Sequence, residues 1–315
     1  MSLLTEELLR RGHDVTLYAT ADSQTSARLR SLYPRGYNEE EDLWDWQFHE
    51  SEHAAHAFEH AGDHDLIHAH DYHFSLPFSR LVDTPLVETP HVEVAPEVVE
   101  AYRRRPEVNV VAVSDYQRRL LGGAPNVSVI HHGIDVAAFP FAPRGGDYLL
   151  FLGRMLADKG PAQAIDVARS CGMPLVLAGP REDGYDIEAQ PAVDGDRVRY
   201  VGRVDSAERD RLLAGAAALL FPAVYPEPFG LVMVEAMACG TPVVATALGA
   251  VPEIVDESVS GLTAASWEGL AELVPAAAAL DRAEVRRTAE ARWDFRRMVD
   301  DHERLYRRVA AGEGA

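Results

Sequence analysis

Residues 218–246, ALLFPAVYPEPFGLVMVEAMACGTPVVAT, contain two short apolar runs on either side of a segment with helical character. The runs 218–222 and 242–246 predict two buried strands. Residues 229–240 predict a helix between them that ends at a glycine. Because Pro228 disfavours a continuous helix from Glu227, we expect the helix to begin near Gly230. The stretch therefore predicts one strand–helix–strand unit of a parallel sheet.

The same alternation of short apolar strands and helices runs through the rest of the chain. We expect further strands at 13–20, 65–70, 84–89, 108–114, 126–132, 148–153, 174–179 and 198–202. We expect further helices at 3–12, 48–62, 115–121, 160–172, 206–216, 267–280 and 294–311. Such alternation predicts an α/β fold with parallel sheets covered on both faces.

A proline and two glycines in residues 141–148 indicate a hinge between two domains. The sequence predicts two Rossmann-like, doubly wound domains, residues 1–142 and 143–292, facing a ligand cleft. We expect the C-terminal helix, residues 293–315, to pack back toward the N-terminal domain.

Composition narrows the classes of function. The 315 residues carry a formal net charge of −20, which would repel a nucleic-acid backbone. No apolar run approaches the ~20 residues of a membrane span, and the first residues lack the pattern of a signal peptide. The two cysteines, Cys171 and Cys239, have no CxxC neighbour, which is typical of buried cytosolic thiols. We therefore expect a cytoplasmic protein without a transmembrane segment.

The segment FLGRMLADKG, residues 151–160, has the features of a phosphate-binding loop. A strand ends at Gly153, Arg154 and Lys159 follow, and a helix opens near Gly160. A basic pair beside a helix N-terminus suits a diphosphate, although such pairs are often simply surface charge. Lys159 is the only lysine among 30 basic residues, which favours a specific role for its compact point charge.

Two glutamates flank the N-terminus of the helix predicted after Gly230. Glu227 lies in the loop before it and Glu235 in its first turns. The N–H groups around Phe229 to Leu231 would suit a phosphate oxygen, and Glu235 would suit two adjacent ribose hydroxyls. Glu227 would hold sugar hydroxyls or stabilise developing positive charge. The alternative is that both acids only complement the helix dipole.

Histidines recur at helical spacing in the first half of the chain. They are His49, His53, His56, His60 and His64, followed by His68, His70 and His73. Pairs four residues apart bind zinc in many proteins. Neighbouring acids instead favour a solvated helix face, and we predict no metal site there. At the end of the strand 65–70, His70 or Asp71 would be placed to contact an acceptor.

Several motifs resemble the family 4 glycosyltransferases. GRMLADKG (153–160) followed by EPFGLVMVEAMACGTPVVAT (227–246) resembles their C-terminal signature. VPEIVDESVSGL (251–262) and VIHHGID (129–135) resemble adjoining elements, with His132 where asparagine is usual. YLLFLGR (148–154) and DVTLYATADSQTSARL (14–29) are similar to the branch typified by an avilamycin-assembly glycosyltransferase.

The resemblance implies a GT-B fold and retaining transfer of a hexose from a nucleotide-sugar to an acceptor hydroxyl, without a metal or cofactor. The acceptor would be a sugar, a lipid-linked molecule or a natural product. In the donor site, the resemblance implies that Arg154 and Lys159 bind the diphosphate and that the backbone of Phe229, Gly230 and Leu231 contacts phosphate and sugar. It also implies that Glu235 binds the ribose and Glu227 the transferred sugar. The implied active-site histidine is His91, which has a purely structural alternative.

Other functions stay open at this point. A nucleotide-sugar epimerase or phosphorylase would share the fold, but a phosphorylase usually needs a lysine for pyridoxal phosphate, and Lys159 is already placed in the diphosphate loop. An inactive donor-binding remnant is a further alternative.

The beginning of the chain departs from the family. A doubly wound half normally opens with a strand, whereas this chain opens on the helix 3–12 and then gives the strand 13–20. The strand and the glycine-rich loop that family members carry there are not found. That strand lies near the middle of the sheet, so we expect a gap with unpaired backbone on both sides. We also expect an upstream start that adds about 20–30 residues.

Overall fold

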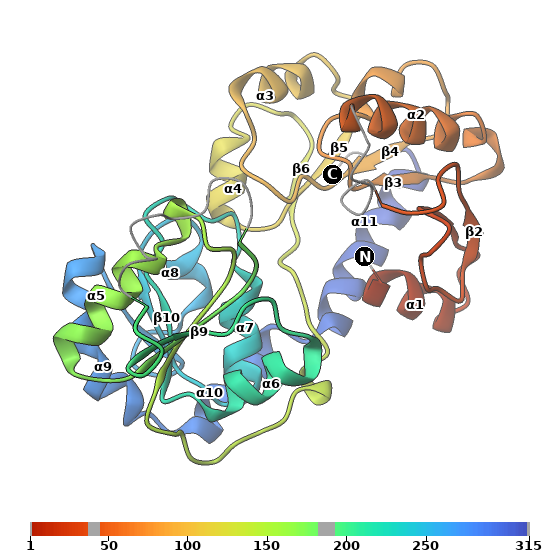
Figure 1. Ribbon diagram of the computed structural model, residues 1–315. Helices are drawn as coiled ribbons and strands as arrows, with labels where there is room; N and C mark the ends of the chain where they lie inside the picture. Colours follow the sequence, from red (N-terminus) through yellow and green to blue (C-terminus); the bar gives the residue numbers. More distant parts are fainter. Residues whose placement is uncertain (1, 37–44, 182–192, 314–315) are drawn as a thin grey trace. The chain divides into compact units, whose positions relative to one another are not determined.

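The computed structural model describes residues 2–36, 45–181 and 193–313, which form two compact α/β units (Figure 1). Unit 1 comprises Met1–His131 and Phe295–Ala315, and unit 2 comprises His132–Asp294. The C-terminal helix α11 (Phe295–Ala310) belongs to unit 1. From the sequence we expected the corresponding boundaries at 142/143 and 292/293.

Unit 2 is built on one six-stranded sheet in the order β12-β11-β10-β7-β8-β9, and every pairing is parallel. The strands are β7 (Leu149–Leu152), β8 (Leu175–Ala178), β9 (Val198–Tyr200), β10 (Ala218–Phe221), β11 (Val243–Thr246) and β12 (Gly261–Ala264). Counted along the chain, the spatial order is 3-2-1-4-5-6, which is the doubly wound order expected from the sequence.

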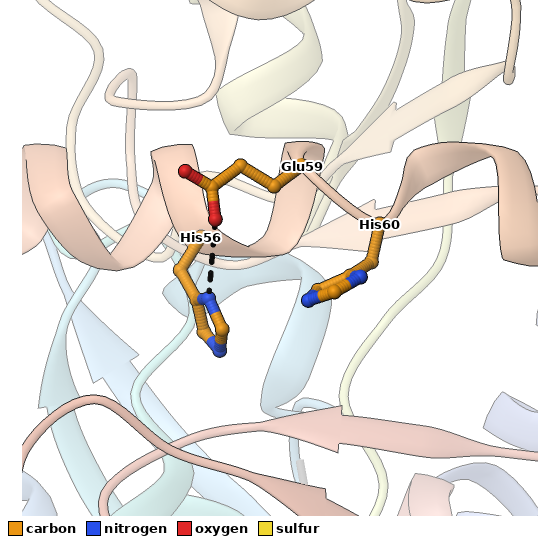
Figure 2. Close-up of side chains that lie close together, drawn as sticks. All are labelled: His56, Glu59 and His60. Atoms are coloured by element: carbon orange, nitrogen blue, oxygen red, sulfur yellow. Dashed lines mark ion pairs between the residues drawn. The ribbon is translucent and has the colours of Figure 1, made fainter.

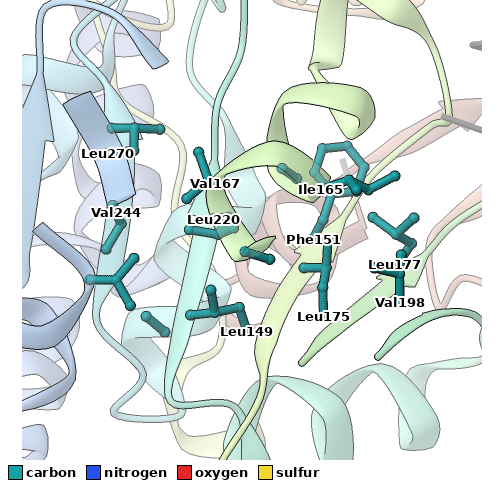
Figure 3. Close-up of a cluster of buried hydrophobic side chains, with 14 of the residues drawn as sticks. Leu149, Phe151, Ile165, Val167, Leu175, Leu177, Val198, Leu220, Val244 and Leu270 are labelled. Atoms are coloured by element: carbon teal, nitrogen blue, oxygen red, sulfur yellow. The ribbon is translucent and has the colours of Figure 1, made fainter. Parts of the chain in front are cut away.

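Helices cover both faces of this sheet (Figure 1). They are α5 (Pro161–Cys171), α6 (Ser206–Gly215), α7 (Leu231–Ala238), α8 (Val251–Ile254), α9 (Leu270–Ala278) and α10 (Arg282–Arg292), with short 3₁₀ turns η4 (Val136–Ala138), η5 (Ala157–Lys159) and η7 (Trp267–Gly269). Helices α5 and α9 pack on one face, and Figure 3 shows their side chains meeting alternate residues of the strands. Helices α6, α7 and α10 pack together, with α7 against β10 and β11. Because both faces are covered, the strands are apolar throughout.

Unit 1 has its strands in two separate parallel sheets, β1-β2 and β3-β4-β5-β6. The strands are β1 (Thr16–Tyr18), β2 (Arg28–Arg30), β3 (Ile67–Ala69), β4 (Leu86–Glu88), β5 (Asn109–Ala112) and β6 (Val127–Val129). The helices are α1 (Ser2–Arg10), α2 (Trp46–Phe58), α3 (Pro96–Arg103), α4 (Asp115–Leu120) and α11, with 3₁₀ turns η2 (Ala61–Asp63) and η3 (Leu76–Phe78).

The division of unit 1 into two sheets matches a sheet that lacks its first strand. A complete doubly wound order would place one strand between β1 and β3. Among the residues that the structure describes, no strand pairs with either of these two on that side. The strand expected at 13–20 is correspondingly short, and β2 is the one strand in the described ranges with which β1 forms a ladder.

Packing of α1 on α11 helps to hold unit 1 together. Leu4 and Leu8 of α1 share an apolar cluster with Phe295 and Val299 of α11. Beside it, the Arg11 guanidinium contacts Asp300 at 2.6 Å and Glu303 at 2.5 Å. None of the helices in the described ranges is both long and apolar enough to cross a bilayer.

Candidate functional site

Two neighbouring strands of unit 2 carry the loops that the sequence analysis singled out. Strands β7 and β10 lie side by side at the point where the strand order reverses. Ligands of doubly wound folds bind beyond the carboxyl ends of the strands at this point. The loop after β7 carries Arg154 and Lys159, and the loop after β10 carries Glu227. The topology therefore brings the two predicted motifs to the same edge of one sheet.

Backbone contacts fix these two loops against each other. The amide of Val224 donates a hydrogen bond to the Asp158 carbonyl at 3.1 Å. Gly160 has φ +80°, and a Cβ built there would lie 2.3 Å from the Pro222 carbonyl oxygen. Only glycine allows so close an approach in this conformation. The positions of Lys159 and of the loop after β10 are therefore coupled through the backbone.

Lys159 and Glu227 form an ion pair across the two loops. Lys159 ends the turn η5, and its ammonium also lies 3.7 Å from Asp158. The side chains of Lys159 and Glu227 are 23% and 17% exposed, so this pair is partly shielded from water. An ammonium carries three N–H groups, which lets Lys159 contact Glu227 and an anionic ligand at the same time. The sequence analysis named both residues but did not predict their contact.

A turn from a third loop holds the backbone of Glu227. The amide of Ala250, after β11, donates to the Glu227 carbonyl at 3.0 Å. Gly249 has φ +60°, and a Cβ there would lie 2.4 Å from the Glu227 carbonyl oxygen. The glutamate is thus fixed at its main chain by the turn after β11 and at its side chain by Lys159.

Helix α7 begins at Leu231 with Gly230 as its N-cap, as the sequence predicted. Phe229 is 2% exposed, and its ring is edge-on to the rings of His132, at 5.0 Å, and Trp293, at 5.6 Å. The Leu231 side chain is 44% exposed. A buried aromatic ring therefore anchors the first turn of the helix, whose N–H groups and dipole favour an anion.

Glu235, in the second turn of α7, is held by Arg209 of α6 at 3.3 Å. Arg209 also contacts Asp210 at 2.7 Å and lies over the Phe139 ring at 4.9 Å. Burial raises the pKa of Glu235, and the Arg209 charge opposes that rise. A carboxylate accepts up to about four hydrogen bonds, so one contact to Arg209 leaves capacity for two hydroxyls. Nothing in the sequence distinguished Arg209 from Arg211, the other arginine of this helix.

In unit 1, His91 pairs with His70. His70 follows β3 and His91 follows β4, and these neighbouring parallel strands end at the same edge. His70 Nδ1 lies 2.9 Å from His91 Nε2, and the two rings are stacked at 15°. Desolvation by surrounding protein lowers the pKa of His70 well below its ordinary value and that of His91 to about 4. Both rings are therefore neutral near pH 7, and one donates its N–H to the other.

A buried hydrogen-bond network connects the loops beside this pair. The Tyr102 hydroxyl donates to Glu88 Oε1 at 2.9 Å and also lies 3.4 Å from the Tyr72 carbonyl oxygen. Tyr72 has φ +68°, and its hydroxyl accepts from the Ala95 amide at 3.1 Å. Burial, reinforced by the nearby Asp71, raises the pKa of Glu88 well above its ordinary value. A carboxyl with a strongly raised pKa and a backbone conformation rare for tyrosine are both typical of functional loops.

Comparisons with known proteins cover both units. Residues 2–138 match the family model described as Glycosyltransferase Family 4, and residues 138–291 match the model described as Glycosyl transferases group 1. Glycogen synthase of Mycobacterium tuberculosis (strain ATCC 25618 / H37Rv) is 30% identical over 290 residues, covering 79% of this chain and 70% of that protein. Phosphatidyl-myo-inositol mannosyltransferase of Mycobacterium leprae (strain TN) is 29% identical, covering 79% of this chain and 75% of that protein.

Solved structures agree with the fold. AviGT4, a glycosyltransferase involved in avilamycin A biosynthesis, is 27% identical with a TM-score of 0.74, covering 98% of this chain and 88% of that one. Sucrose-phosphate synthase from Thermosynechococcus elongatus is 21% identical with a TM-score of 0.80, covering 98% and 92%, and shows the shared fold. With matches over both units, the chain belongs to the family 4 glycosyltransferases and has their GT-B fold.

Proposed function

We propose that the protein is a retaining hexosyltransferase that takes a sugar from a nucleotide-sugar donor and passes it to an acceptor hydroxyl. The observation that carries this proposal is the junction of the loops after β7 and β10, where Lys159 meets Glu227. This junction lies at the switch point of a complete doubly wound sheet. The names of the relatives, a glycogen synthase and a mannosyltransferase, support a hexosyl donor.

Each donor-site residue has a role that follows from its chemistry. Arg154 and Lys159 would bind the diphosphate, together with the N–H groups around Phe229, Gly230 and Leu231. Glu235, oriented by Arg209, would accept hydrogen bonds from the ribose hydroxyls. Glu227, fixed at its backbone and side chain, would bind hydroxyls of the transferred sugar.

During transfer, the bond between the anomeric carbon and the phosphate oxygen breaks, and the acceptor oxygen bonds to that carbon on the same face. Negative charge develops on the departing diphosphate, which also takes the acceptor proton. Fixed positive groups stabilise such charge more strongly in the transition state than in the ground state. Lys159, Arg154 and the α7 dipole supply these groups, and Glu227 stabilises positive charge on the sugar.

We propose that transfer needs no divalent ion at the diphosphate. The cations named above fill the role that a metal fills in other transferases. We likewise propose that no further cofactor takes part. We place the enzyme in the cytoplasm, where free thiols such as Cys171 and Cys239 persist.

On the acceptor side, we propose that His91 contacts the reacting sugar and that His70 holds its ring. Their hydrogen bond fixes the orientation and the tautomer of His91. A neutral imidazole donates to or accepts from a sugar hydroxyl without introducing charge. The acceptor class is a hydroxyl of a sugar, a lipid-linked molecule or a natural product.

The test combines donor binding with product stereochemistry. Calorimetric titration with a panel of UDP-, GDP- and ADP-hexoses should identify one tight donor, and that donor should then be incubated with candidate acceptors. We expect NMR of the product to show the donor's anomeric configuration, with turnover unchanged by excess chelator. An inverted anomer, or activity abolished by chelator and restored by metal, would contradict the mechanism. An epimerised donor would identify an epimerase, and binding without turnover would identify a donor-binding remnant.

A further inference from the structure

The structure separates the histidines of the 49–64 tract into two groups. Three of them contact unit 1 itself: the His49 ring lies 4.4 Å from the Tyr33 ring, and His53 Nε2 lies 3.1 Å from the Tyr18 carbonyl. His64 Nε2 lies 3.1 Å from the Tyr18 hydroxyl. All five are half-buried, whereas the neighbouring acids Glu52, Glu59 and Asp63 are exposed, so the predicted solvated face holds for the acids and not for the histidines. The reason is that Tyr18 and Tyr33 pack against this face of α2.

The other two histidines converge with a carboxylate. Figure 2 shows His56, Glu59 and His60 at the end of α2, and their ligand atoms all lie within 4.8 Å of one another. His56 Nδ1 is 3.6 Å from Glu59 Oε2. Because His56 and His60 are four residues apart, one helical turn places them on the same face. The turn continues past the last residue of α2, since the amide of His60 donates to the Ala57 carbonyl at 3.2 Å.

Surrounding groups orient the two rings. The Tyr18 ring is edge-on to His56 at 5.7 Å and stacked on His60 at 6.4 Å. Tyr18 is itself held by the contacts from His53 and His64 described above. Asp63 Oδ2 lies 3.9 Å from His60 Nδ1. Metal-bound histidines commonly donate the N–H of the ring nitrogen that does not bind the metal to a carboxylate, and Asp63 is close enough to take this role. This arrangement limits the orientations of both imidazoles.

We propose that His56, Glu59 and His60 bind one divalent transition-metal ion of the zinc class. Two imidazoles and one carboxylate suit zinc rather than magnesium or calcium, which prefer oxygen ligands. Zinc ligands lie ~2.0–2.2 Å from the metal and therefore roughly 3.3 Å from one another in a tetrahedron. Closing from the observed spacing needs small side-chain rotations, and Glu59, whose side chain is 71% exposed, has room to make them.

The local charge is compatible with a cation. Glu59 and Asp63 contribute negative charge, whereas Arg30 is the nearby cation, and its guanidinium lies 3.6 Å from Asp63. Water would complete the coordination sphere. The ion would connect the end of α2 to the following turn and stabilise folded unit 1 by mass action. The site lies in unit 1, whereas the proposed diphosphate loops lie in unit 2.

The test is calorimetric titration of the untagged chain with Zn²⁺, paired with Co²⁺ absorption spectra that report tetrahedral coordination. We expect saturable 1:1 binding, weakened at least about 10-fold in His56→Ala, His60→Ala and Glu59→Gln. Two control variants should bind Zn²⁺ with wild-type affinity. They are His49→Ala, on the same helix, and His91→Ala, in the His70–His91 pair. Thermal unfolding without metal checks that each variant is folded, and Glu59→Gln is the variant least disruptive to packing.

Three results would overturn the proposal. The first is a wild-type chain that shows no saturable Zn²⁺ binding. The second is a folded His60→Ala or Glu59→Gln variant that binds Zn²⁺ with wild-type affinity, and the third is loss of Zn²⁺ binding in His91→Ala instead. The last result would place the ion at the His70–His91 pair.

Discussion

The two units use related folds but hold their loops in different ways. In unit 2 the sheet is complete, and the loops after its central strands are fixed by backbone contacts such as Gly160 against Pro222 and Gly249 against Glu227. In unit 1 the strands form two sheets, and the loops after β3 and β4 are linked by side-chain hydrogen bonds between His70 and His91 and between Tyr102 and Glu88. Backbone contacts are insensitive to pH, whereas buried histidines and carboxyls are sensitive to it. Unit 1 should therefore respond to acid far more strongly than unit 2.

The largest expected change in stability comes from a substitution that disrupts a backbone contact of unit 2. Gly249→Ala would place a Cβ 2.4 Å from the Glu227 carbonyl oxygen in a left-handed conformation, φ +60°. We expect a loss of roughly 3 kcal/mol or more in the free energy of unfolding. Gly172→Ala is the matched control, with φ +71° and nothing within 4 Å of the added Cβ, and should cost about 1 kcal/mol. Urea denaturation compares them, and equal losses would show that the contact is not important.

The next prediction concerns acid sensitivity in unit 1. His302 is buried, and desolvation lowers its pKa from 6.5 to about 4. The unfolded chain then binds a proton that the native state rejects, so stability falls as pH drops from about 6.5 to 4. Protonation of His302 alone should lower the free energy of unfolding by roughly 3 kcal/mol across that pH range.

The pKa values of His68 and His70 are also lowered, chiefly by burial, and add to the loss. We expect His302→Gln to unfold with a shallower acid dependence in denaturation at stepped pH. An unchanged slope would contradict the assignment to this group.

A third prediction concerns catalysis. If His91 contacts the reacting sugar, His91→Ala should lower kcat by about 10²-fold or more while the melting temperature stays close to that of the wild type. His49→Ala, which removes a histidine of the same unit outside this pair, is the control. Near-normal turnover of the His91 variant would leave it a structural residue.

The smallest expected effect is a loss of stability as pH rises, the opposite of the effect of His302. The pKa of Glu88 in the folded protein is raised well above 4.5. The protonated Glu88 side chain therefore contributes its full stabilisation below pH 4.5, and this contribution is lost as pH rises toward the folded-state pKa. Glu88→Gln keeps the shape, cannot ionise and still accepts from Tyr102. We expect the free energy of unfolding of the variant to rise relative to that of the wild type on going from pH 5 to pH 8. A constant difference in unfolding free energy across this range would show that Glu88 does not titrate in it.

Local sequence patterns predicted most of unit 2. Five of the six strands and the start of α7 after Gly230 follow from short-range signals, whereas β12 was not predicted. Helix α10 was missed because its buried face includes Arg282 and Thr288 and lacks an apolar stripe. Arg282 is satisfied by carbonyls distant in sequence, including that of Ala216 at 2.9 Å. Such partners become visible only in the folded chain.

The candidate site was predicted as a set of residues, without their contacts. Lys159 and Glu227 are 68 residues apart, and their ion pair depends on the adjacency of β7 and β10. The contact of Arg209 with Glu235 likewise requires α6 and α7 to pack together. The interpretation of the histidine tract was incomplete for the same reason, because Tyr18 and Tyr33 reach the histidines of α2 from other segments.

The central claim is that the loops joined by Lys159 and Glu227 bind the donor diphosphate. Calorimetric titration of the identified nucleotide-sugar into Lys159→Ala tests it most directly. Losing a charge-assisted contact should weaken binding by about 1.5–3 kcal/mol, or roughly 10- to 150-fold, with folding intact. Arg211→Ala is the control, because it removes an exposed cation of the same unit whose ion pair is with Glu208. Unchanged donor affinity in folded Lys159→Ala, or an equal loss in Arg211→Ala, would contradict the claim.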